Sequence, residues 1–348
     1  MSNKKEISSF TPEELLSELR QRESKTLAKS KSNLSGFPAK EIFENLLESQ
    51  KVIYGVDDRK EIFEIVESNI LNNADSIVAI FNFDQIVSNG DGTSKLSTRS
   101  YKEAHRLCSE EPFLDQPVGP HCTGFLVAPD IIATAGHCIN GTNFLMKRFV
   151  FGFQMINSSL PTLTISDKNI FKAIGIIDRR LEQTGSDYAL IRLDRPVTGR
   201  KVLKLNQKEK IADNEDLYVI GHPSGLPKKF ADGAKVRDNS ASTHFVANLD
   251  TYAGNSGSPV FNANTHEVEG ILVRGENDFV LVNGCARSLV CPSTGCRGED
   301  VTRVSEFLDK VPKIIDPVNS LEERVANLEV SIQSFKSDFD ELKALLKK

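Results

Sequence analysis

The middle of the chain alternates short apolar runs with turn residues. From position 76 onward, about eleven runs rich in β-branched and aromatic residues are separated by glycine, proline, asparagine and aspartate. These runs cover residues 76–83, 124–127, 131–134, 149–153, 170–177, 188–193, 217–220, 245–248, 259–261, 267–273 and 279–282. Since no long helical period lies between them, the pattern predicts an all-β domain, built as a sandwich or as a pair of barrels.

The stretch before this domain has a different pattern. Residues 1–50 are rich in Lys, Glu and Ser and contain two short helical periods, so we expect a polar, helical extension there. Residues 51–75 predict a short strand followed by a helix over 57–72, and we expect this segment to pack on the β domain. Within the domain, residues 88–118 form a long polar insertion between predicted strands.

The β domain is expected to end with a helix over 302–311, and a heptad pattern follows at 318–348. Apolar residues there are spaced alternately three and four apart: Val318, Leu321, Val325, Leu328, Ile332, Phe335, Phe339, Leu342 and Leu346. An amphipathic helix packed on its own domain would have a period nearer 3.6. The regular alternation favours a coiled coil, and hence a homo-oligomer formed through it.

Composition excludes some classes of partner. The chain has 348 residues, 39% hydrophobic residues and a net charge of −5, which does not indicate nucleic-acid binding. No apolar run reaches the roughly 18 residues of a membrane span, so we expect no membrane association. The polar first residues do not resemble a signal peptide, which predicts a cytoplasmic location and leaves secretion by another route open.

Three short strings carry candidate chemistry. Ser256 lies in the string 253–260, with Gly254 before it and Gly257 after it. Glycines at these places leave the serine hydroxyl and nearby N–H groups open to a substrate. Alone, this string is more often a tight loop between strands than a catalytic site. His137 follows an apolar strand at a strand-to-loop junction, and Asp187 opens another apolar strand. A base and an acid are what a serine needs in order to act as a nucleophile.

These strings resemble, in type and in order, the histidine, aspartate and serine motifs of trypsin- and chymotrypsin-like serine endopeptidases. The string 122–127 also resembles the strand that precedes the histidine in that family. The resemblance implies two six-stranded antiparallel barrels over residues 76–311 and hydrolysis of a protein or peptide substrate through an acyl-enzyme, without metal or cofactor. It assigns Ser256 as nucleophile, His137 as base, Asp187 as the acid that orients it, and the N–H groups of Gly254 and Ser256 as the oxyanion hole.

The residues around Ser256 also resemble one branch of the family. Asn255 stands where digestive enzymes carry an aspartate that receives a new N-terminus, and the string 254–262 looks like the bacterial branch that includes glutamyl endopeptidases. A neutral Asn cannot form that ion pair. We therefore predict that no trypsin-style activating salt bridge is required.

Substrate preference depends on the pocket residues that the resemblance implies. Asp250 falls at the pocket base and Thr251 on its wall, while Leu272 and Gly275 belong to the later pocket strand. Leu272 replaces a histidine of the glutamyl enzymes, which argues against cleavage after Glu. An acid at 250 favours cleavage after Arg or Lys, unless Arg274 fills the pocket or pairs with Asp250.

The chain contains six cysteines. The resemblance pairs Cys122 with Cys138. The other four are Cys108, Cys285, Cys291 and Cys296. Their spacing is wide for a zinc site, so two disulfides or free thiols are favoured over a metal.

Another class of function stays open at this point. The chain would then be a latent or regulatory protease-like binding module, oligomerised by the coiled coil.

Overall fold

The computed structural model describes residues 57–139, 143–182, 185–207, 210–275, 278–292 and 295–312, together with 53–54 and the single residues Glu18, Phe37 and Gly141. The helical extension expected over 1–50, apart from Glu18 and Phe37, and the coiled coil expected over 318–348 lie outside the described residues. Both stay predictions.

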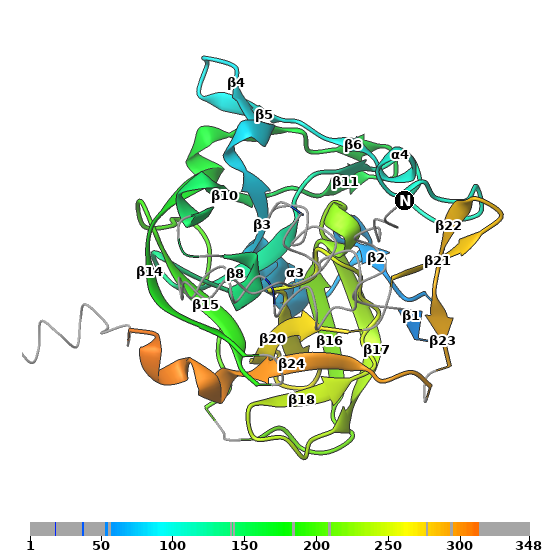
Figure 1. Ribbon diagram of the computed structural model, residues 1–348. Coiled ribbons are helices and arrows are strands. Elements are labelled where there is room, and N and C mark those ends of the chain that lie inside the picture. The colour runs from blue at the N-terminus through cyan, green and yellow to red at the C-terminus, as the bar shows by residue number, and fades with distance from the viewer. Residues whose placement is uncertain are drawn as a thin grey trace, which may run out of the picture. The chain divides into compact units, whose positions relative to one another are not determined.

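Six antiparallel strands close a first barrel (Figure 1). They are β3 (Ile77–Asn82), β8 (Cys122–Ala128), β9 (Ile131–Thr134), β10 (Lys147–Phe151), β14 (Ile170–Leu181) and β15 (Asp187–Leu193), in the order β10-β14-β15-β9-β8-β3. Every residue of β8 and β9 is buried, because each strand is covered on both faces.

A second barrel contains β16 (Asp216–Gly221), β17 (Lys229–Asp238), β18 (His244–Ala247), β19 (Pro259–Asn262), β20 (Val268–Arg274) and β24 (Glu299–Arg303). The strand order is β16-β19-β20-β24-β18-β17, and pairing of β16 with β17 closes the ring. Residues before the first barrel add to this sheet, since β2 (Lys60–Glu61) pairs with the edge of β17. Thus the all-β prediction of two six-stranded barrels is confirmed.

The two barrels share one apolar core. Phe125 and Leu190 of the first barrel belong to the same cluster of buried residues as Tyr218 and Phe261 of the second. The rings of Tyr218 and Phe261 stack with centroids 4.7 Å apart. Because the shared core fixes one barrel against the other, loops at the junction are held in place from both sides.

Smaller elements decorate the barrels. These are β1 (Ile53–Tyr54), η2 (Ile62–Glu64), α3 (Ser68–Asp75), η3 (Phe83–Gln85), β4 (Ile86–Ser88), β5 (Thr93–Leu96), β6 (Arg99–Ser100), α4 (Tyr101–His105), β7 (Pro117–Val118), η4 (Gly136–Cys138), η5 (Asn143–Met146), β11 (Met155–Asn157), β12 (Leu160–Pro161), β13 (Thr164–Ser166), η6 (Asp167–Asn169), η7 (Pro223–Gly225), β21 (Phe279–Val282), β22 (Cys285–Ser288), β23 (Val290–Cys291), η8 (Val304–Glu306) and η9 (Leu308–Lys310).

Two local predictions were wrong. The helix expected over 57–72 begins only at Ser68, because Lys60 and Glu61 pair with β17 instead. The helix expected over 302–311 is replaced by the end of β24 and two short 3₁₀ turns, since Thr302 and Arg303 are drawn into the sheet between β18 and β20. The polar insertion 88–118 contains the end of a β-hairpin and the short helix α4.

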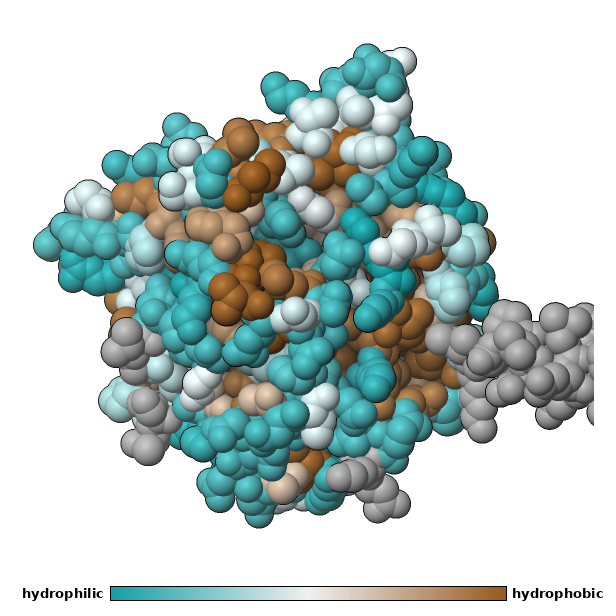
Figure 2. Space-filling view, turned by 180° about the vertical axis from the view of Figure 1, so that it is seen from behind, coloured by the Kyte–Doolittle hydropathy of each residue, from teal (hydrophilic) through white to brown (hydrophobic). Residues whose placement is uncertain are grey.

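The face of the molecule opposite to the view of Figure 1 is largely hydrophilic, with separate brown patches between the polar side chains (Figure 2). Within the described residues, no helix has the length and apolar character needed to cross a bilayer.

Candidate active site

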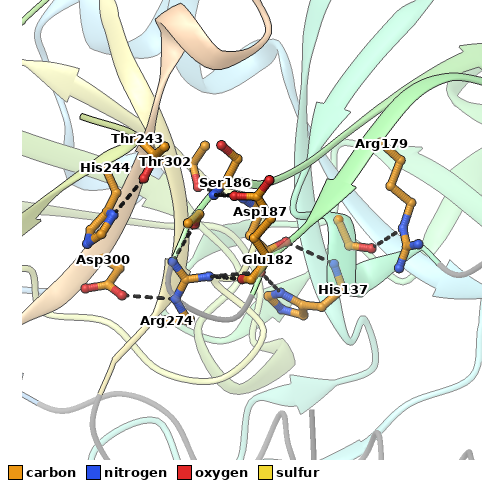
Figure 3. Close-up of polar contacts among 12 residues, drawn as sticks. His137, Arg179, Glu182, Ser186, Asp187, Thr243, His244, Arg274, Asp300 and Thr302 are labelled. Carbon is orange, nitrogen blue, oxygen red and sulfur yellow. Dashed lines mark hydrogen bonds and ion pairs between the residues drawn. The ribbon is translucent and has the colours of Figure 1, made fainter. Parts of the chain in front are cut away.

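His137 and Asp187 come together because their strands pair. His137 lies in η4, directly after β9, and Asp187 is the first residue of β15, which pairs with β9. The Nδ1 atom of His137 lies 2.8 Å from a carboxylate oxygen of Asp187, and the backbone N–H of His137 donates to the other oxygen at 3.1 Å (Figure 3). Both residues are buried. The carboxylate therefore fixes the position and the tautomer of the imidazole.

Gly136 makes this approach possible. A Cβ atom at this position would lie 2.1 Å from the carbonyl oxygen of Arg180 and 2.8 Å from that of Tyr188. Only a glycine allows the chain before His137 to pass so close to the facing backbone of β14 and β15.

The charge of Asp187 is stabilised by two neighbours. Burial acts to raise the pKa of this carboxyl, but the imidazole of His137 and the guanidinium of Arg274 outweigh burial, and the pKa is lowered from its ordinary value. The Nη1 atom of Arg274 lies 3.8 Å from Asp187. Asp187 thus remains an anion at neutral pH.

Arg274 does not pair with Asp250, so that alternative was wrong. Its Nε donates to Asp300 at 3.0 Å, and its two terminal nitrogens donate to the carbonyl oxygens of Glu182 and Gly185 (Figure 3). The bonds hold the guanidinium beside Asp187. Sequence reasoning did not identify Arg274 as a group that stabilises Asp187.

Ser256 lies in the loop before β19, between two glycines with left-handed backbone. Gly254 has φ +92° and Gly257 has φ +88°, and a Cβ at Gly257 would lie 2.1 Å from the carbonyl oxygen of Thr123. The backbone N–H of Thr123 donates to the carbonyl oxygen of Ser256 at 2.9 Å, and Sγ of Cys138 lies 3.6 Å from the same oxygen. The loop of Ser256 is therefore joined to the residue that follows His137.

Atom Nε2 of His137 is buried and has no hydrogen-bond partner within the described part of the chain. This is the ring nitrogen that remains after Nδ1 has bound Asp187. In unliganded enzymes the bond between base and nucleophile is often long and shortens only when substrate binds.

Thr123 also orients the loop that carries the expected oxyanion hole. Its hydroxyl donates to the carbonyl oxygen of Gly254 at 2.8 Å and accepts the N–H of His222 at 3.0 Å. The peptide between Gly254 and Asn255 therefore has a fixed plane. Nothing in the sequence around Thr123 distinguished it from other strand residues.

Asn255 is held inside the loop by neutral groups. It is 2% exposed, its backbone N–H donates to Tyr252, and the Ser258 hydroxyl donates to its side-chain oxygen at 3.4 Å. The side chain of Asn255 is thus held by neutral groups, and the prediction that no activating salt bridge is required stays a prediction.

The expected pocket residues separate into two groups. Asp250 accepts the backbone N–H groups of Tyr54 at 2.6 Å and Asp58 at 3.2 Å, so it faces the segment before the first barrel. The side chain of Leu272 is buried in the core of the second barrel. Thr251 and Gly275, by contrast, both contact the carboxylate of Glu299.

Strand β20 is joined to the Ser256 loop by two backbone hydrogen bonds. The N–H of Leu272 donates to the carbonyl oxygen of Ser258, and the N–H of Gly257 donates to that of Leu272. Thr251 precedes this junction in the loop and Gly275 follows β20, and both contact Glu299.

A cavity of about 510 Å³ lies beside the Ser256 loop. It is lined by Ala253 and Gly254 of that loop, by Ser224 and Gly225, and by residues between 82 and 121. Part of the insertion between β3 and β8 therefore forms the wall of a space that reaches Gly254.

All six cysteines form disulfides, which are Cys108–Cys285, Cys122–Cys138 and Cys291–Cys296. Among the described residues, the one cluster with the proximity of metal ligands is Cys122, His137 and Cys138. Because both sulfurs are oxidised, they offer no thiolate to a metal.

Residues 122–271 match the family model described as "Trypsin-like peptidase domain". This region contains His137, Asp187 and Ser256. A search of curated protein sequences found no match.

Solved structures with a similar fold are those of proteases. A Glu endopeptidase in complex with MPD shares 16% identity over 75% of this chain and 97% of its own, with a TM-score of 0.43. The VesB protease of Vibrio cholerae shares 17% identity over 74% of this chain and 66% of its own, with a TM-score of 0.44. A serine endoprotease from Yersinia pestis shares 13% identity over 71% and 67%, with a TM-score of 0.41.

Proposed function

Because this chain is a serine endopeptidase of the trypsin/chymotrypsin-like family, we propose that it cleaves peptide bonds through an acyl-enzyme formed on Ser256. The observation that carries the proposal is the buried His137–Asp187 pair, 2.8 Å apart, next to the loop of Ser256. His137 accepts the proton of the Ser256 hydroxyl and later delivers it to the leaving amine. Asp187 orients the imidazole and stabilises the imidazolium.

The oxyanion of the tetrahedral intermediate would accept the backbone N–H groups of Gly254 and Ser256. The bond from Thr123 to the peptide between Gly254 and Asn255 supports this role, because it orients the loop before substrate arrives. Preorganised donors of this type contribute about 10²–10³ each to turnover.

We also propose that the enzyme cleaves after Arg or Lys. Two buried carboxylates lie next to the expected pocket wall: Glu299 accepts the hydroxyl of Thr251, and Asp278 accepts the backbone N–H of Ala253. A pocket lined by one sign of charge attracts substrate side chains of the opposite sign.

Labelling with a neutral fluorophosphonate, followed by mass spectrometry, tests the catalytic assignment. The wild-type protein should be labelled on Ser256, while Ser256→Ala and His137→Ala should each lose the label. Equal labelling of His137→Ala would contradict the role of His137 as base.

The three disulfides support a proposal about the compartment. Disulfides persist in oxidising environments and are rare in reducing cytosol, so we propose that the protein works outside a reducing compartment, contrary to the cytoplasmic expectation. Alkylation of the protein as isolated from its source, before and after reduction, should detect six thiols only after reduction.

We also propose that the protein forms a homo-oligomer through the coiled coil expected over 318–348. Light scattering of the full chain should give a mass that is a multiple of the mass of one chain, whereas a chain ending at 312 should give the mass of one chain. A full chain with the mass of one chain would contradict the oligomer.

A further inference from the structure

The carboxylate of Glu299 lies between Thr251 and Gly275, the two expected pocket walls. The hydroxyl of Thr251 donates to Oε2 of Glu299 at 3.1 Å. A Cβ atom at Gly275 would lie 2.1 Å from Oε2 and 2.2 Å from Oε1. The carboxylate therefore occupies the space towards which a side chain at 275 would point.

Strand β24 directs Glu299 towards the pocket and Asp300 away from it. Side chains of successive strand residues point to opposite faces. Asp300 faces Arg274 and the triad carboxylate, as Figure 3 shows. Glu299 is consequently on the other face, where it meets Thr251.

The glycine at 275 has a steric reason. It is not among the residues with positive φ, so its backbone does not require a glycine. A Cβ at this position would force the Glu299 carboxylate to move from its present place. Glu299 is fully buried, whereas its neighbour Gly275 is partly exposed. Solvent therefore lies nearest to the Glu299 carboxylate on the side of Gly275.

Asp250 is poorly suited to bind a substrate cation. Both of its oxygens accept backbone N–H groups from the segment 54–58. Burial, which outweighs these bonds, raises its pKa to about 6. An acid with that pKa loses part of its charge in weakly acidic solution, and its oxygens are directed towards the chain's own amides.

We propose that Glu299, and not Asp250, is the carboxylate that binds the Arg or Lys side chain preceding the scissile bond. This inference rests on the proposed function, since it assigns the specificity of that same site. A cation that enters between Thr251 and Gly275 meets a carboxylate shielded from water, where a charge-assisted hydrogen bond is strong.

The first test uses fluorogenic peptides that differ only in the residue before the cleaved bond, with Arg, Lys, Leu, Gln or Glu at that place. Glu299→Gln should lower kcat/KM for Arg and Lys peptides by about 10- to 150-fold, the range for a hydrogen bond to a charged group, and change Leu and Gln peptides far less. Asp250→Asn should keep the preference for Arg and Lys.

Glu269→Gln is the matched control, because Glu269 is a buried glutamate of β20 that bonds Asn206 and Asn262 away from the pocket. It should keep the wild-type preference. An unchanged preference in Glu299→Gln, or its loss in Asp250→Asn, would overturn the assignment. So would a wild-type enzyme that prefers Leu, Gln or Glu, although labelling of Ser256 would still uphold the proposed hydrolysis.

A second test does not depend on catalysis. Benzamidine, a small aromatic amidinium, is titrated calorimetrically into Ser256→Ala and into Ser256→Ala combined with Glu299→Gln. The first protein should bind the probe at least tenfold more tightly. Equal binding, or no binding to either, would overturn the role of Glu299 even if Ser256 proved inactive, so the two proposals fail separately.

Discussion

Two buried aspartates, each close to the Ser256 loop, differ in the sign of the charges around them. Asp187 faces His137 and Arg274, and these neighbours outweigh burial and lower its pKa. Asp250 faces the backbone of 54–58 and the carboxyl of Asp58; burial raises its pKa to about 6, and burial with the charge of Asp250 raises the pKa of Asp58 to about 8. The same residue type is therefore a permanent anion in one region and a weak acid in the other.

The two regions are also built differently. The region of His137 and Asp187 is formed by paired strands of a closed barrel, and its groups are joined by the Arg274 network. Near Asp250, Glu61 forms an ion pair with Lys229, and the guanidinium of Arg59 lies 4.3 Å from the ring centre of Tyr252. The charge that we propose for catalysis is therefore stabilised by its neighbours, whereas the charges of Asp250 and Asp58 are partly removed by protonation.

The largest effect is expected from removing the charge of the first aspartate. Asp187→Asn should lower kcat by about 10⁴, because an asparagine leaves the imidazole in the wrong tautomer while the geometry is retained. Steady-state kinetics on an Arg peptide measures this loss. Asp178→Asn, a change of the same type on β14, should stay close to wild type, since Asp178 bonds only the Tyr188 hydroxyl among described contacts. Comparable losses in both variants would remove the special role of Asp187.

The disulfide next to His137 should contribute more to the free energy of unfolding than the Cys291–Cys296 disulfide. Replacing Cys122 and Cys138 together by serine opens a loop with a sequence separation of 16 residues, and we expect a loss of about 3 kcal/mol in the free energy of unfolding. Replacing Cys291 and Cys296 opens a separation of only 5 residues and should cost about 2 kcal/mol. Urea unfolding measures both.

Activity at 20 °C separates the two pairs further. The Cys122–Cys138 variant should lose turnover beyond its loss of stability, because Cys138 follows His137 and contacts the Ser256 carbonyl oxygen. If the Cys291–Cys296 variant lost more turnover than the Cys122–Cys138 variant, activity would not depend specifically on the disulfide next to His137.

Arg274 offers a finer test of the first region. Arg274→Gln should lower kcat/KM by about tenfold and move the acid limb of its pH profile upward by about half a unit to one unit. Without the guanidinium, the charge of Asp187 is compensated only by the protonated His137. His137 therefore holds its proton more tightly, and the acid limb moves upward. Arg274→Lys should return the limb towards its original pH. A loss of activity with an unmoved limb would show that Arg274 acts only through packing.

Sequence reasoning predicted the first region better than the second. His137, Asp187 and Ser256 stand in strings whose residue types follow from their chemistry, and each predicted strand overlaps an observed one. Strand β24 was not predicted, because four of its five residues are polar and their burial depends on partners from other elements. For the same reason Glu299 was not identified, and the alternative that Arg274 pairs with Asp250 was wrong. The charges that surround a buried group come from distant parts of the chain, and no local pattern records them.

The smallest expected effect concerns the weak acid of the second region. Because the pKa of Asp58 is raised to about 8 in the folded protein from an ordinary value of 3.8, the folded chain binds this proton more tightly than the unfolded chain. The stability it contributes is complete below about pH 4 and is lost as the pH rises to about 8. Asp58→Asn imitates the protonated form, so at pH 8 it should raise Tm by about 1–3 °C, a modest value because the group is partly exposed to solvent. At pH 4 the two proteins should melt together.

Thermal unfolding between pH 4 and pH 8 measures this difference, and Asp216→Asn is its control. Asp216 is exposed, pairs with Lys235 and is not among the charges that raise the pKa of Asp58, so its replacement should shift Tm by an amount that hardly varies over this range. If the Tm of Asp58→Asn fell with rising pH as steeply as the Tm of the wild-type protein, Asp58 would not be the group that holds the proton. In that case the segment 53–61 would carry a full negative charge beside Asp250, and the contrast with Asp187 would rest on the Arg274 network alone.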